Sequence, residues 1–158
     1  MKEVGMDFKY LREYEKKQRE NFEKVIETTE KIKKPIVVHS RSAEKECIEM
    51  LESSKLKKVV MHCFTGNKKL IKKGADLGFY FSIPAVIQRL QHFQMLAEII
   101  NINQLLTETD APWLSPELGR FSEPADVLGT VKKIAEIKGF TVEEVANNIF
   151  LNYKKVFE

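Results

Sequence analysis

The chain contains only two cysteines, Cys47 and Cys63, among its 158 residues. A small secreted scaffold stapled by disulfides is therefore excluded, and without an N-terminal hydrophobic signal segment we expect a reducing, cytoplasmic setting. No apolar run approaches the ~20 residues that cross a bilayer, so no membrane partner is expected. The chain also lacks a large excess of charge of one sign, because 26 basic and 23 acidic side chains leave a net charge of +3. That imbalance is too small to indicate a nucleic-acid binder by charge alone.

The rest of the composition is that of a globular chain with a core. Hydrophobic residues make up 43% and charged residues 31% of the sequence, which excludes a disordered polypeptide. We find no linker, repeat or low-complexity stretch. The length therefore predicts one domain that covers residues 1–158.

Segments of strand and helix periodicity alternate along the chain. After a short N-terminal segment at Glu3, strands are predicted near residues 36–38, 59–61, 79–83 and 105–106. Helices are predicted at residues 10–33, 93–100 and 127–137, and after the capping residues Ser42, Asn67 and Thr141, the last with Glu144 in a capping box.

This alternation predicts an α/β fold built from parallel βαβ units. Five parallel strands with outer helices amount to a partial (β/α)8 TIM barrel. A complete barrel needs ~250 residues, so about the first three βα units are expected to be lacking.

Three predicted strands end on or just before a side chain that can bind a metal. His39 follows PIVV, His62 follows VVM, and Asp110 ends the segment QLLTETD, while Glu3 opens the chain. Because active sites of α/β barrels are built at the C-terminal ends of the strands, we expect these side chains to converge there. Two imidazoles and two carboxylates indicate a divalent metal site that is hydrolytic rather than redox-active.

Six short motifs follow one another along the chain. They are EVGMDF at residues 3–8, Gln18 with Phe22, PIVVHSR at 35–41, HCFTG at 62–66, LGFYFS at 77–82 and TETDAPWL at 107–114. In this order and spacing they make the chain resemble the TatD family of metal-dependent deoxyribonucleases, which are amidohydrolase-like TIM barrels. Glu123-Pro124 and the segment EEVA at residues 143–146 extend the resemblance towards the C-terminus.

The resemblance implies a role for each predicted ligand. Glu3 corresponds to a carboxylate that bridges two metal ions, and His39 and His62 correspond to ligands of one ion. Asp110 corresponds to a ligand of the other ion that also handles the proton of the attacking water. The implied catalytic residues are thus Asp110 and Glu3, and two ions ~3.5–4 Å apart would acidify a bridging water and neutralise charge on the phosphate.

The sequence departs from the family at the second metal position. Family members begin with a strand that carries a His-x-His pair, whereas this chain has three histidines, His39, His62 and His92, and no such pair. We therefore expect one bound divalent ion (Mg²⁺, Zn²⁺ or Mn²⁺) instead of two, and impaired activity. We also expect a homo-oligomer to cover the open barrel edge.

Three further residues are candidates for substrate binding. Arg41 and Arg120 carry guanidinium groups that match phosphate oxygens, and Trp113 could stack on a base. A plain surface role, or for Trp113 a covering role, is the alternative. Asp7 is predicted either to support a ligand or to form a turn, and Glu108 to lie behind the ligands.

The predicted function is that of a TatD-type metal-dependent hydrolase, a deoxyribonuclease that cleaves DNA phosphodiester bonds. Two alternatives stay open. The chain could be an inactive remnant or an oligomerising interaction module. It could also be an esterase such as an aminoacyl-tRNA deacylase, because related sites handle carbonyl and phosphoryl centres alike.

Overall fold

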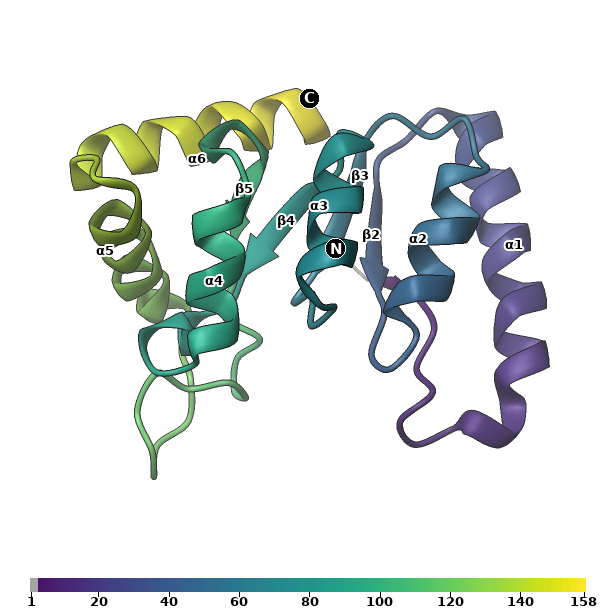
Figure 1. The fold of residues 1–158 in the computed structure, drawn as a ribbon, viewed down its shortest axis with the longest axis horizontal. Coiled ribbons are helices and arrows are strands. Elements are labelled where there is room, and N and C mark those ends of the chain that lie inside the picture. Colours follow the sequence, from purple (N-terminus) through teal and green to yellow (C-terminus); the bar gives the residue numbers. More distant parts are fainter. Residues whose placement is uncertain (1–2) are drawn as a thin grey trace. The chain divides into compact units, whose positions relative to one another are not determined.

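The structure, a computed structural model, describes residues 3–158. The predicted α/β class with five strands is confirmed (Figure 1). The chain divides after Tyr80 into two compact units. Whether the strands belong to a partial barrel, and whether the chain is a single domain, stay predictions.

In the first unit, three parallel strands alternate with helices. The elements are β1 (Val4–Gly5), α1 (Glu15–Ile32), β2 (Ile36–His39), α2 (Glu44–Glu52), β3 (Val59–His62) and α3 (Lys68–Asp76). β2 pairs with β1 on one side, with Val38 opposite Val4, and with β3 on the other, with Val38 opposite Met61. Val38 and Met61 are completely buried, so the middle of this sheet forms the core and its strand ends carry the polar side chains.

In the second unit, two parallel strands alternate with helices. The elements are β4 (Tyr80–Ile83), α4 (Gln91–Ile99), β5 (Leu105–Thr107), α5 (Val127–Lys138) and α6 (Val142–Phe157). Ser82 lies opposite Leu106 in the β4–β5 pair. Nδ2 of Asn152 on α6 donates hydrogen bonds to the backbone oxygens of Ile102 and Leu105, at 2.7 and 2.8 Å. These bonds attach α6 to the start of β5.

Each helix buries one face. α1 buries Phe22, Ile26 and Thr29, which recur at helical spacing, and exposes charged residues elsewhere. α5 approaches residues 85–88 closely at Gly129, where a Cβ atom would lie 2.2 Å from the Gln88 side chain.

In the described part of the chain, no helix is long and apolar enough to cross a membrane.

Two of the three predicted helix caps are confirmed. Oδ1 of Asn67 accepts a hydrogen bond from the N–H of Leu70 at 3.1 Å, and Thr141 and Glu144 form the capping box of α6. The prediction for Ser42 was wrong, because Ala43 is the residue that precedes α2. Ser42 instead adopts a left-handed φ of 58° in a turn closed by the Ala43 N–H on the Ser40 carbonyl, at 2.9 Å.

Candidate metal centre

Glu3, His39 and His62 form a cluster beside the C-terminal ends of β2 and β3. One ligand atom from each lies within 4.8 Å of the others. Nε2 of His62 is 2.9 Å from Oε2 of Glu3, and Nδ1 of His39 is 3.8 Å from the same oxygen. The centroids of the two imidazole rings are 6.3 Å apart. The structure thus brings together three of the four ligands that the sequence suggests.

Strand pairing places the cluster. His39 is the last residue of β2 and His62 is the last residue of β3, one step beyond the paired residues Val38 and Met61. Glu3 precedes β1, whose Gly5 lies opposite His39. Two of the side chains therefore end neighbouring strands and the third immediately precedes β1, and parallel pairing brings all three to one end of the sheet.

Gly5 allows β1 to approach β2 closely enough for this arrangement. Its φ of +138° is a backbone conformation that other residues rarely adopt, and a Cβ atom there would lie 2.0 Å from the backbone oxygen of His39. The next residue, Met6, donates its N–H to that same oxygen at 3.0 Å. Gly5 is a determinant of the site that sequence reasoning missed, and its place between Glu3 and Asp7 was the available signal.

The dimensions of the cluster suit a small divalent ion. Metal–ligand bonds of ~2.0–2.2 Å place donor atoms roughly 3–4 Å apart around a four-coordinate ion. The two distances from Glu3, 2.9 and 3.8 Å, are close to this range. Two imidazoles and one carboxylate are also the ligand set of several catalytic zinc sites, in which the fourth position is open to water or substrate. Side-chain exposures of 42% for Glu3 and 12% for His62 leave one side of the cluster accessible.

Asp7 lies directly behind His39. Its Oδ2 is 3.4 Å from Nε2 of His39, on the side of the ring opposite the nitrogen that faces Glu3. Gln18 fixes the Asp7 backbone, because its Oε1 accepts from the Asp7 N–H at 2.7 Å and its Nε2 donates to the Asp7 carbonyl at 3.0 Å. A carboxylate in this position orients the imidazole and selects the tautomer that leaves Nδ1 free to bind a metal.

The surroundings of Asp7 keep it ionised. Burial acts to raise the pKa of Asp7, but the hydrogen bonds from Arg41 and from the Lys9 N–H, with the charge of Arg41, lower it below the ordinary 3.8. Nε of Arg41 donates to Oδ2 of Asp7 at 2.9 Å, and Nη2 donates to the same oxygen. The guanidinium of Arg41, which the sequence suggests as a phosphate contact, is therefore held against Asp7, although 43% of the side chain is exposed.

Glu44 connects the loops that follow His39 and His62 through hydrogen bonds. Its Oε1 accepts a hydrogen bond from Oγ1 of Thr65 at 2.6 Å and from the N–H of Ser42 at 3.3 Å. Ser42 and Cys63, in these two loops, both adopt left-handed backbone conformations, with φ of 58° and 42°. Such conformations are unfavourable for these residue types and persist only where neighbouring contacts hold them.

A thiol of the first unit lies near the cluster but does not take part in it. Sγ of Cys47, on α2, lies 3.8 Å from the backbone oxygen of His39. Burial raises the pKa of the Cys47 thiol to about 12. The thiol therefore stays protonated at neutral pH, which makes it a poor nucleophile and a poor metal ligand.

The remaining predicted site residues belong to the second unit. Asp110 follows β5 with a left-handed φ of 56°, and its backbone oxygen accepts from the N–H of Trp113 at 2.8 Å. The side chain of Trp113 is 70% exposed. Glu108 accepts a hydrogen bond from Oγ of the buried Ser82 at 2.6 Å.

Arg120, the other predicted phosphate contact, is paired within its own loop. Its Nη1 lies 3.0 Å from Oδ2 of Asp126, and its Nε lies 3.3 Å from Oε2 of Glu117. Asp126 also accepts hydrogen bonds from the Ser122 hydroxyl and from the N–H of Glu123, at 3.1 and 2.9 Å. Sequence reasoning missed Asp126, which stands three residues after Glu123 in a capping-box arrangement.

The pair of Arg120 and Asp126 predicts a loss of stability in acid. The hydrogen bonds from Arg120 and from the Glu123 N–H lower the pKa of Asp126 from 3.8 to about 2. Because the folded-state pKa is the lower one, the ionised carboxylate stabilises the fold above pH ~4. That contribution is lost as the pH falls through about 2. We expect the urea midpoint of the wild type to exceed that of Asp126→Asn near neutrality, with a difference that shrinks towards pH 2. An equal difference at both pH values would contradict the role of the ionised form.

Comparison with known proteins assigns the chain to a family. The family model described as "TatD related DNase" matches residues 2–158. The chain belongs to this family. The resemblance seen in the motifs is thereby confirmed. Among similar proteins, the uncharacterized metal-dependent hydrolase MJ1582 of Methanocaldococcus jannaschii is 36% identical over 156 residues, which cover 99% of this chain and 61% of that protein.

Human deoxyribonuclease TATDN3 is 33% identical over 159 residues, which cover 98% of this chain and 58% of the human protein. Among solved structures, YJJV, a TATD homolog from Escherichia coli K12, has a TM-score of 0.90 at 20% identity and covers 99% of this chain and 62% of its own. That likeness concerns the fold alone. The chain spans about three-fifths of the length of these relatives.

Proposed function

We propose that this TatD-family chain acts as a metal-dependent hydrolase that cleaves phosphodiester bonds in DNA. The observation that carries the proposal is the convergence of Glu3, His39 and His62 within 4.8 Å. Family membership and the name of the human relative, deoxyribonuclease TATDN3, support DNA as the substrate. We also infer that the five strands correspond to part of a (β/α)8 barrel, as the likeness to YJJV suggests.

In this proposal the chain's residues hold the ion and move one proton. Nδ1 of His39, Nε2 of His62 and the Glu3 carboxylate would be the ligands of the ion, while Asp7 accepts from Nε2–H of His39 and fixes its ring. A bound divalent ion would lower the pKa of a water molecule and offset negative charge on the phosphate. The carboxylate of Asp110 would accept the proton of the attacking water, the role that the family resemblance gives it.

We propose one ion per chain. Within residues 3–158, Glu3, His39 and His62 are the one group of three or more such ligands that is close enough to hold a metal. A second copy of the chain could supply further ligands and cover the sheet edge at β1, which pairs with β2 on one side only in the described part of the chain. Sedimentation of the purified chain measures this oligomeric state directly.

The test of the proposed function is ion-dependent cleavage of labelled single-stranded DNA. We expect cleavage with added Mg²⁺, Mn²⁺ or Zn²⁺, none after the ions are removed with a chelator, and none by Glu3→Gln, which removes the carboxylate charge from the cluster. Glu143→Gln, an exposed glutamate on α6, is the matched control and should cleave like the wild type.

Two outcomes of this assay would contradict the proposal. Ion-dependent hydrolysis of an aminoacyl ester without any cleavage of DNA would favour the deacylase alternative. A chain that binds the ion but hydrolyses neither substrate would favour an interaction module.

A further inference from the structure

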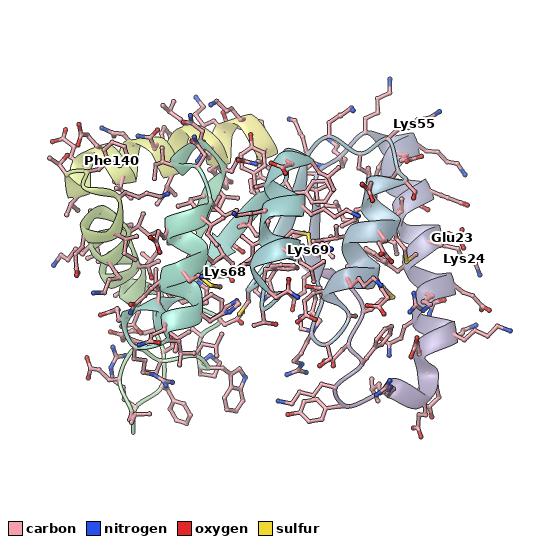
Figure 2. The ribbon with its side chains drawn as sticks, viewed as in Figure 1. Glu23, Lys24, Lys55, Lys68, Lys69 and Phe140 are labelled. Atoms are coloured by element: carbon pink, nitrogen blue, oxygen red, sulfur yellow. The ribbon has the colours of Figure 1, made fainter. Side chains whose placement is uncertain are left out.

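Six lysines surround a single cavity at the end of the first unit opposite the metal centre. The cavity has a volume of about 570 Å³. Its lining consists of Glu30, Leu56 and the six lysines Lys31, Lys33, Lys34, Lys55, Lys57 and Lys58. We refer to these eight residues as the lysine pocket. Figure 2 labels Lys55 at the end of this unit, beyond the last turn of α1.

Two hydrogen bonds bring the lysines together from separate loops. Lys31, Lys33 and Lys34 lie at the C-terminal end of α1 and just after it, whereas Lys55, Lys57 and Lys58 lie between α2 and β3. The backbone N–H of Lys55 donates to Oε1 of Glu30 at 2.6 Å. The N–H of Ile36 donates to the backbone oxygen of Lys58 at 2.9 Å. The two loops are therefore fixed side by side, and the pocket is a built feature of the fold.

Positive charge outweighs negative charge in the lysine pocket. It contains six of the chain's 26 basic side chains but one of its 23 acidic ones. In the described part of the chain, none of these six ammonium groups forms an ion pair with a carboxylate, whereas Lys45 and Lys73 on α2 and α3 each do. Like charges around one cavity repel each other, and a bound anion would relieve that repulsion.

A simpler explanation covers only part of the arrangement. Basic residues are favourable near the C-terminus of a helix, where the macrodipole is negative, and Lys31 lies in the last turn of α1. That effect fades within one turn and does not account for Lys55, Lys57 and Lys58, which lie on a different loop. A requirement of the fold does not explain Lys55 and Lys57 either, because their side chains are exposed.

We propose that the lysine pocket binds a small anion that carries several phosphate groups, such as an oligophosphate or a nucleoside triphosphate. Its volume is in the range of small-ligand sites, and ammonium groups bind phosphate well as point charges. Six lysines gathered around one cavity suit a compact anion better than an extended nucleic-acid backbone, which needs a long basic face. β2 separates the two sites, because His39 is its last residue and the lysine pocket adjoins its first residue, Ile36. At ~3.3 Å per residue, the Cα atoms of Ile36 and His39 are roughly 10 Å apart. Binding of an anion in the lysine pocket therefore does not require a metal ion at Glu3, His39 and His62.

The test is calorimetric titration of tripolyphosphate into the full chain after divalent ions have been stripped, so that no metal can recruit phosphate to Glu3, His39 and His62. We expect binding that weakens with added salt. The triple variant Lys34→Gln, Lys55→Gln, Lys57→Gln should bind at least tenfold more weakly. The matched control is Lys16→Gln, Lys17→Gln, Lys24→Gln, three exposed lysines on α1, and it should stay within twofold of the wild type. Figure 2 shows Lys24 part-way along α1, away from Lys55.

Several outcomes would overturn the proposal. The proposal is wrong if the wild type does not bind tripolyphosphate at low salt, or if both triple variants lose the same amount of affinity. If a short single-stranded oligonucleotide binds through the pocket lysines and tripolyphosphate does not, the site is a nucleic-acid contact. Should the pocket variant fail to fold, acetylation of the wild type decides the matter. Tripolyphosphate should protect Lys55 and Lys57 from the reagent and leave Lys24 reactive, and equal reactivity of all three would refute the pocket.

Discussion

A His62→Ala variant is expected to bind Zn²⁺ at least a hundredfold more weakly than the wild type. His62 provides one of the three side chains that converge in the cluster, and with 12% exposure its place is not readily taken by bulk water. Loss of residues that merely orient a ligand already weakens metal binding by about 10–100-fold, so loss of a ligand should cost more. Competition with a chromophoric chelator at neutral pH measures the affinity.

Two further variants make this experiment specific. His92→Ala removes a histidine of the second unit that is outside the cluster, and it should bind Zn²⁺ like the wild type. Asp7→Asn keeps all three ligands but loses the carboxylate behind His39, so its affinity should fall between the two, by about tenfold. If His62→Ala and His92→Ala bind the ion equally well, the ion is held elsewhere and the assignment of the cluster is wrong.

An Asp110→Asn variant is expected to lose all ion-dependent cleavage of single-stranded DNA. Asparagine has nearly the same shape but cannot accept the proton of the attacking water. Removing a general base typically costs 10²–10⁴-fold in rate. The wild type itself should be slow, since a site with one ion lacks half of a two-metal clamp and each ~1.4 kcal/mol of lost stabilisation is a tenfold loss of rate. Product formation under single-turnover conditions measures both rates.

The control for this variant is Asp76→Asn, an exposed aspartate on α3, which should cleave at the wild-type rate. Zn²⁺ affinity supplies a second readout, because Asp110 is not among the three clustered ligands and Asp110→Asn should therefore bind one ion normally. A variant that cleaves DNA as fast as the wild type would indicate a contaminating nuclease or an Asp110 without a catalytic role. Cleavage that survives in every preparation of Glu3→Gln identifies the contaminant.

The order and type of the elements could be predicted from the sequence because each depends on local periodicity. The run PIVVH predicted a strand that ends on His39, and the structure has β2 at Ile36–His39. The failure at Ser42 has a physical reason. A serine before a helix is a cap only in an extended conformation, and the turn between Ser40 and Ala43 sets a left-handed φ at Ser42 instead.

The support around the site was less accessible to sequence reasoning, because it depends on contacts between distant residues. Asp7 and Arg41 are 34 positions apart, and their pairing follows from the approach of β1 to β2. A guanidinium is equally suited to a phosphate and to a carboxylate, so the sequence could not decide between these partners. The same reasoning applies to Arg120, whose partner Asp126 was not singled out.

The different backbone positions of the three ligands have a consequence for selectivity among ions. His39 and His62 end β2 and β3, so the spacing of their Cα atoms is set by strand pairing, and Asp7 holds the ring of His39. Glu3 precedes β1, and its exposed side chain has three rotatable bonds. An ion of larger or smaller radius can therefore be accommodated by rotation of the carboxylate alone, without a change of register. The centre combines two nitrogen ligands on fixed strand ends with one adjustable oxygen ligand, an arrangement that tolerates several divalent ions.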